Sequence, residues 1–197
     1  MIKRSELIKY AVSNFTKFGS KRITMDDLAK ALGISKKTIY NYFESKEHLV
    51  IASVSYLIAN LKQAVDKILN NDNYDAITKI ILIYKIGFER LNDFKPSFIF
   101  GLKKYYPKAN DVFDAFRYEI VNETIYGLLK EARTKGLIKP QVSLQLFCNL
   151  YFKRFEEVAL RNNNLIENYS NEELLNHFVV YSLRGIAVSN YKNTYFE

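Results

Sequence analysis

Apolar side chains recur at intervals of three and four residues along almost the whole of this 197-residue chain, and they do not alternate as they do in β-strands. That interval places them along one face of an α-helix. Only three prolines and seven glycines interrupt the pattern, so few positions would break a helix. The sequence therefore predicts an all-α protein without a strand.

The first fifty residues predict a helix-turn-helix. A helix over residues 3–18 precedes the segment Thr-Met-Asp-Asp at residues 24–27, which has the pattern of a capping box and begins a second helix. Gly33 allows the chain to turn, and Ser35 can cap a third helix over residues 36–42. Two short helices joined by a glycine turn form the motif.

A fourth helix is predicted to start at Ser45 and to run past Val65 to Ile68 as a long connector. Prolines, glycines and asparagine runs separate the segments that follow it. Further helical patterns cover residues 75–92, 96–105, 109–135, 141–161 and 171–191.

Positive charge is concentrated at the N-terminal end. Residues 1–50 hold ten of the 29 basic residues but only five of the 21 acidic ones, which is +5 of the total net charge of +8. Such a local excess indicates a surface that binds a polyanion, although a solvated lysine face has the same composition. Lys36 and Lys37 begin the third helix, the place where helix-turn-helix proteins contact bases and phosphates. Thr38 and Tyr40 add hydroxyl groups beside them.

Residues 33–49, GISKKTIYNYFESKEHL, resemble the recognition helix and the following helix start of the TetR family. Members of that family read as a Gly-hydrophobe-Ser turn, a Thr-hydrophobe-Tyr core and then Tyr-Phe-x-x-Lys-Glu-x-Leu. Phe18-Gly19 and Thr24-x-x-x-Leu28-Ala29 match upstream, so the resemblance covers about residues 7–50. Ser20 departs from the usual aromatic, and Ile23 replaces the first of two threonines.

The resemblance implies a three-helix DNA-binding head over residues 1–46, joined by the connector helix to a helical effector-binding and dimerisation bundle over residues 47–197. It implies a sequence-specific transcriptional regulator, a homodimer that represses from a palindromic double-stranded operator until a small apolar or aromatic effector releases it. The implied contacts are to phosphates from Thr24, Thr38, Tyr42 and Lys46, and to bases or to both from Lys36, Lys37 and Tyr40.

Aromatic residues are frequent after the head and suit an apolar effector cavity, but they equally suit an ordinary core. The predicted effector contacts are Phe88, Phe100, Tyr105, Phe113, Tyr126, Phe147, Tyr151 and Phe155.

The last long helix resembles the family's dimer interface in position and length. Ser182, Gly185 and Ser189 are predicted to form a ridge of small residues that permits close helix packing. The predicted interface residues are Leu174, Leu175, Phe178, Tyr181, Ser182, Gly185, Ile186 and Ser189.

Other classes of protein find less support in the sequence. Cys148 is the single cysteine, and His48 and His177 lie far apart, so we expect no disulfide, no metal and no cofactor. No apolar run is long enough to span a membrane, and we expect a cytoplasmic protein. Ser189 and Lys192 have the spacing of a catalytic pair without supporting motifs, so an enzyme is not predicted. An all-helical interaction or scaffold protein remains the alternative.

Overall fold

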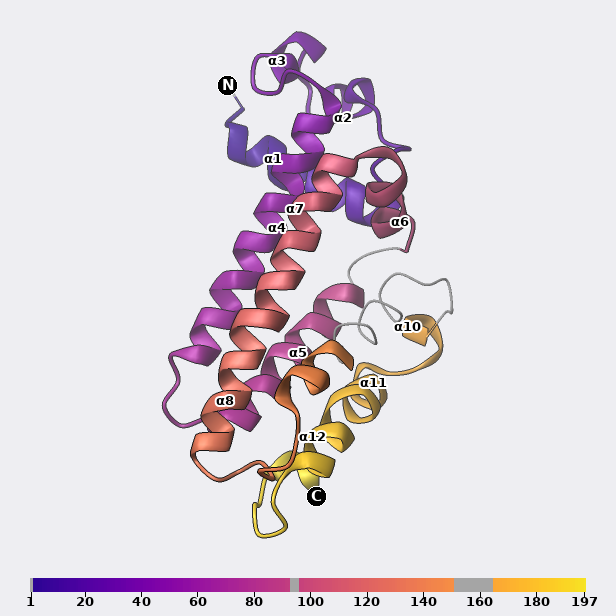
Figure 1. Cartoon of the computed structure of the whole chain (residues 1–197). Helices are drawn as coiled ribbons and strands as arrows, with labels where there is room; N and C mark the ends of the chain where they lie inside the picture. Colours follow the sequence, from indigo (N-terminus) through magenta and orange to yellow (C-terminus); the bar gives the residue numbers. More distant parts are fainter. Residues whose placement is uncertain (1, 93–95, 151–164) are drawn as a thin grey trace. The chain divides into compact units, whose positions relative to one another are not determined.

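The computed structural model describes residues 2–92, 96–150 and 165–197, and the described chain is helical (Figure 1). The helices in its first half are α1 (Arg4–Phe18), α2 (Met25–Ala31), α3 (Lys36–Tyr40), α4 (Lys46–Leu69), α5 (Ala76–Asn92) and α6 (Pro96–Tyr105). Those that follow are α7 (Pro107–Glu119), the π-helical η1 (Ile120–Ile125), α8 (Tyr126–Thr134), α10 (Leu165–Asn168), α11 (Asn171–Leu175), the π-helical η2 (Asn176–Val180), α12 (Tyr181–Ile186) and the 3-10 turn η3 (Thr194–Phe196). Residues 144–150 are helical as well. The predicted all-α fold is confirmed.

The helices form two compact units. Unit 1 comprises Met1–Lys62 and Asp93–Phe116, and unit 2 comprises Gln63–Asn92 and Arg117–Glu197. Unit 1 thus contains α6 and most of α7 in addition to the N-terminal helices. The predicted division at residue 46 separates functions rather than compact units, and it stays a prediction.

Unit 1 is built around apolar side chains from four of its helices. Leu7 and Phe15 of α1, Leu28 of α2, Ile39 of α3 and Leu49 of α4 are at most 1% exposed. Each comes from the apolar face of its helix, so the periodicity seen in the sequence accounts for this core. In addition, α1 packs against α6, and α2 packs against α3.

Local capping fixes the ends of the short helices. Thr24 begins α2 with a capping box in which its hydroxyl accepts a hydrogen bond from Asp27 N at 3.1 Å and its own backbone N–H donates to Asp27 Oδ2 at 2.8 Å. Ser35 Oγ accepts from Thr38 N at 3.0 Å at the start of α3. Gly33 lies between them with φ of 63°, a conformation that favours glycine. These predicted caps are confirmed.

Unit 2 has a larger apolar core, in which α5 packs against α8, α11 and η2. Ile80 and Phe88 of α5, Leu129 of α8, Val179 of η2 and Leu183 of α12 are almost completely buried. The two π-helical turns lie within longer helical runs, so the predicted helix over residues 109–135 is present with η1 at its centre.

The predicted helix over residues 171–191 is too long. The helical run that begins at Asn171 ends at Ile186, and Ala187 is extended, with φ of −68° and ψ of 151°. Ala187 forms an isolated antiparallel bridge with Ile138. The bridge uses hydrogen bonds from Lys139 N to Ile186 O at 2.9 Å and from Val188 N to Leu137 O at 3.1 Å.

This early end changes the predicted ridge of small residues. Ser182 and Gly185 lie on α12, but Ser189 lies beyond its end and cannot continue the same helical row. Pairing with a distant segment stops the helix although the apolar pattern continues. The third helix is also shorter than predicted, since α3 ends at Tyr40.

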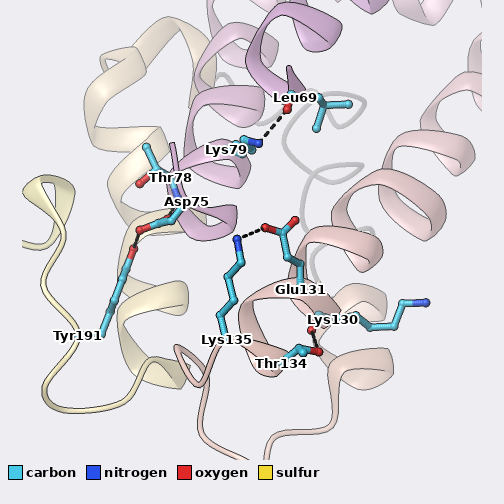
Figure 2. A network of polar contacts seen from close by, with 9 residues as sticks. All are labelled: Leu69, Asp75, Thr78, Lys79, Lys130, Glu131, Thr134, Lys135 and Tyr191. Atoms are coloured by element: carbon cyan, nitrogen blue, oxygen red, sulfur yellow. Dashed lines mark hydrogen bonds and ion pairs between the residues drawn. The ribbon is translucent and has the colours of Figure 1, made fainter. Parts of the chain in front are cut away.

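Polar contacts hold the C-terminal segment onto α5 (Figure 2). The Tyr191 hydroxyl donates to Asp75 Oδ2 at 2.6 Å, and Asn193 Nδ2 donates to Thr78 Oγ1 at 2.8 Å. Burial, and then the hydrogen bond to Asp75, raises the pKa of Tyr191. Among the described residues, no helix is both long enough and apolar enough to cross a membrane.

Candidate nucleic-acid interface

The exposed surface of α3 carries the predicted base contacts. Lys37 is exposed, and Tyr40 has 44% of its surface exposed. Neither side chain makes a hydrogen bond or an ion pair within the described parts of the chain. Ile39, between them in sequence, is completely buried and anchors the helix. Lys37 and Tyr40 are therefore both held on a packed helix and available to a ligand.

Lys36 is occupied differently from its neighbour. Its Nζ forms an ion pair with Asp26 Oδ2 of α2 at 2.7 Å, on the exposed surface. The hydrogen bond from this ammonium to Asp26 raises the pKa of Lys36. A phosphate contact by Lys36 would therefore compete with Asp26, whereas Lys37 has no such competitor.

The two threonines of the predicted interface form helix caps. Thr24 Oγ1 donates to Asp27 Oδ2 at 2.7 Å, and this contact together with the backbone N–H of Thr24 lowers the pKa of Asp27. Thr38 Oγ1 lies 2.8 Å from Ser35 Oγ. Both hydroxyls are near the starts of α2 and α3, where unpaired backbone N–H groups also favour an anion.

Tyr42 and Lys46 are half-buried and bonded to backbone carbonyls. The Tyr42 hydroxyl donates to Ile2 O at 2.9 Å, and Lys46 Nζ donates to Lys21 O at 3.2 Å. Burial lowers the pKa of Lys46, although the negative charge of Asp27 opposes this shift. The structure thus brings all seven predicted DNA-contact residues into unit 1, with Lys37 and Tyr40 the least engaged.

Sequence reasoning missed two features of this surface. Asp26 was read only as part of a cap, and its ion pair with Lys36 joins residues ten positions apart in two helices. The backbone of Lys21 was not considered as a partner of Lys46. The basic pair Lys21-Arg22 between two predicted helices was the available signal for the second feature.

The predicted effector contacts do not form one described cluster. Phe88, Tyr126 and Phe147 belong to the core of unit 2 or pack against it. Phe100 and Tyr105 are exposed residues of α6 in unit 1, and Phe113 of α7 also lies in unit 1. Tyr151 and Phe155 lie outside the described residues. An open groove of about 620 Å³ does occur in unit 1, lined in part by Arg4, Ile8, His48 and Tyr56, but none of the predicted aromatics lines it.

The predicted dimer residues differ in their exposure. Leu174 and Leu175 are 4% and 5% exposed, so they already pack into the core of their own protomer. Tyr181 is 53% exposed, and Gly185 and Ser189 are also exposed. Phe178, Ser182 and Ile186 are half-buried.

Known proteins match both the head and the whole chain. A sequence model described as "Bacterial regulatory proteins, tetR family" matches residues 7–53. The uncharacterized HTH-type transcriptional regulator YvaF of Bacillus subtilis is 32% identical over 167 residues, which are 83% of this chain and 85% of YvaF. IcaR of Staphylococcus aureus, the HTH-type negative transcriptional regulator of the biofilm operon icaADBC, is 28% identical over 96 residues, which are 49% of this chain and 50% of IcaR.

A solved structure has the same fold. FadR from Bacillus subtilis, a transcriptional regulator crystallised in complex with stearoyl-CoA, superimposes with a TM-score of 0.72 over 93% of this chain and 100% of its own, at 20% identity. The capped helix-turn-helix coincides with the region that matches the family model. The similarity to YvaF extends through most of both sequences. The chain therefore belongs to the TetR family of DNA-binding transcriptional regulators.

Proposed function

We propose that this regulator is a repressor that binds a palindromic operator as a homodimer. The observation that carries the proposal is the state of α3, a capped and anchored helix on which Lys37 and Tyr40 face outward without a hydrogen-bonding partner in the described structure. A helix of this kind enters the major groove with its N-terminal side chains at the base edges. Repression is the usual action of the family, and IcaR is named as a negative regulator.

In this proposal the individual side chains divide the work. Lys37 and Tyr40 read base edges and adjoining phosphates, while Thr24, Thr38, Tyr42 and Lys46 contact phosphates. Lys36 reaches the DNA by exchanging Asp26 for a phosphate or a base acceptor. The regulator acts in the cytoplasm because bacterial operators are there.

A homodimer is proposed because a palindromic site matches a two-fold axis. Its interface includes the exposed side of the run from α11 to α12, with Tyr181 and Gly185. Leu174 and Leu175 would support that face from within the protomer. Two recognition helices then reach successive major grooves about 34 Å apart.

The proposed effector is a small apolar or aromatic molecule that binds in unit 2. Its core contains Phe88 and, packed at its edge, Tyr126 and Phe147, which offer apolar surface and one hydroxyl. An effector shifts the regulator between two states only by its difference in affinity for them. Release from the operator therefore requires an effector that binds the state with weak DNA affinity more tightly.

The experiment is selection of binding sites from random duplex DNA with the native protein, Lys37→Ala and Tyr40→Ala at the same salt concentration. We expect a palindromic site that the native protein enriches and that both variants bind at least about tenfold more weakly, since each good base contact contributes about 1–3 kcal/mol. Lys85→Ala, which removes an exposed lysine of α5, is the matched control. Failure of the native protein to enrich any site would contradict the proposal and favour an interaction protein.

A further inference from the structure

We propose that Tyr106, which joins α6 to α7, is a positioning residue for DNA binding: with the backbone carbonyl of Lys21, its ring holds Lys46 in place for contact with a phosphate. The inference rests on the proposed function, because it assumes that Lys46 contacts DNA. It extends the DNA-binding machinery to a residue far beyond the matched region 7–53.

Two contacts define the position of the Lys46 ammonium. Its Nζ donates to Lys21 O at 3.2 Å and lies 5.8 Å from the centroid of the Tyr106 ring. The second distance is within the range in which a cation is attracted to an aromatic face. A lysine side chain otherwise samples many rotamers, and holding it in one lowers the entropy that a later contact must remove. All three residues lie in unit 1.

The charge of Lys46 remains uncompensated at close range. Within the described structure it forms no ion pair, in contrast to Lys36, which is paired with Asp26 at 2.7 Å. Asp27 and Glu47 are the acidic groups whose charges act on this neighbourhood, on Lys46 and on Tyr106 respectively. A half-buried ammonium without a carboxylate partner is suited to take a phosphate as its counter-ion.

The carbonyl of Lys21 is itself held by α6. Lys21 Nζ lies 3.9 Å from the centroid of the Tyr105 ring, which precedes Tyr106 directly. Upstream in the same turn, Ser20 is completely buried, and Gly19 approaches α6 so closely that a Cβ there would lie 3.3 Å from Ser97 Oγ.

The residues of α6 that receive this turn share one face. Ser97 and Tyr105 lie eight positions apart with Gly101 midway, and a Cβ on Gly101 would lie 3.5 Å from Ser20 Oγ. That interval of four places all three in one row on a helix. The turn before α2 and the Tyr106 ring therefore depend on the same end of α6, and both contact Lys46.

The test compares Tyr106→Leu, which removes the ring but keeps apolar volume, with Tyr106→Phe, which keeps the ring. The measurement is affinity for the selected operator as a function of salt. We expect Tyr106→Phe to match the native protein, and Tyr106→Leu to bind about fivefold more weakly with a log–log salt slope smaller by up to about 0.9, the value of one lost phosphate contact. Lys46→Ala should give the same change, and adding Tyr106→Leu to it should cause no further loss. Tyr118→Leu, at an exposed tyrosine of α7, is the control.

A second readout uses the protein without DNA. An NMR titration of the Lys46 side chain should give a pKa closer to the ordinary lysine value in Tyr106→Leu than in the native protein, because removing the ring reduces burial of the ammonium. Tyr106→Phe should retain the native value. An unchanged Lys46 titration in Tyr106→Leu would overturn the inference.

The DNA measurements separate two kinds of failure. If Lys46→Ala lowers the salt slope but Tyr106→Leu keeps the native slope, the positioning role of Tyr106 is overturned and the phosphate contact stands. If the losses from Lys46→Ala and Tyr106→Leu simply add, Tyr106 has only a structural role. If Lys46→Ala keeps the native slope while Lys37→Ala lowers it, the phosphate contact of Lys46 and its positioning are overturned together, and DNA binding by α3 stands.

Discussion

The two units differ in what their lysine side chains contact. In unit 2, Lys79 Nζ donates to Leu69 O at 2.8 Å, Lys135 pairs with Glu131 at 2.7 Å, and Lys139 Nζ donates to Gly185 O at 2.8 Å (Figure 2). In unit 1, Lys37 has no described partner, and Lys46 has a carbonyl and a ring but no carboxylate.

This difference shows how one chain can separate stability from recognition. A lysine that is bonded to its own fold joins helices and segments, whereas a lysine that lacks a counter-ion can gain one from a polyanion. Both units contain capped helices and apolar cores, so the distinction lies in the charged side chains rather than in the architecture. The following substitutions should affect one unit and spare the function of the other.

The largest effect is expected in the core of unit 2. Leu129 is completely buried, and Leu129→Ala should lower the free energy of unfolding by about 2–5 kcal/mol through lost burial and a residual cavity. Urea denaturation measures this change, with Tyr169→Ala, at a half-exposed position, as the control. At temperatures where the variant stays folded, its operator affinity should equal that of the native protein. A loss below about 0.5 kcal/mol would show that the core is not packed as described.

A smaller loss is expected at the C-terminal segment. Tyr191→Phe removes the hydrogen bond to Asp75 and leaves that carboxylate with one partner fewer, which should cost about 1–3 kcal/mol of unfolding free energy. Thermal and urea unfolding measure the loss. The salt slope of DNA binding should not change, and a changed slope would mean that this network serves recognition as well.

The matched caps give a direct contrast between the units. Thr24 and Ser170 each form a capping box, with Asp27 and Glu173 respectively. Thr24→Ala and Ser170→Ala should each lower the unfolding free energy by about 1 kcal/mol. Only Thr24→Ala should also weaken operator binding. Equal operator affinities in the two variants would remove Thr24 from the proposed interface.

The smallest effect concerns acid. Hydrogen bonds within the capping boxes lower the pKa of Asp27 and of Glu173 from their ordinary values of 3.8 and 4.5. A carboxyl group with a lowered folded pKa stabilises the fold above its unfolded pKa and loses that contribution as pH falls through the folded one. The urea midpoint should therefore decline below about pH 4.5. Asp27→Asn should reduce the decline and Asp72→Asn should not; identical curves would contradict this origin of the acid sensitivity.

Local features explain what could be predicted from the sequence. The starts of α2 and α3 follow from Thr24 and Ser35, because a cap involves residues only three positions apart. The outward position of Lys37 and Tyr40 follows from helical spacing around Ile39. These interactions need no knowledge of the remaining fold.

Contacts between distant segments could not be predicted in this way. The helix from Asn171 ends at Ile186 because the chain then pairs with Ile138, which no local pattern reveals. Aromatic residues gave no means of separating the core of unit 2 from the surface of α6, where Phe100 is 61% exposed. The packing of the turn around Ser20 against Gly101 of α6 likewise joins residues eighty positions apart.

The most direct test of the account is the salt dependence of operator affinity for the native protein, Lys37→Ala and Lys85→Ala. Lys85 is an exposed lysine of α5, so both variants change the net charge equally. We predict that Lys37→Ala binds more weakly and that its log–log slope is smaller by about 0.9, while Lys85→Ala retains the native slope. Equal slopes for all three proteins would contradict the claim that α3 presents Lys37 to DNA.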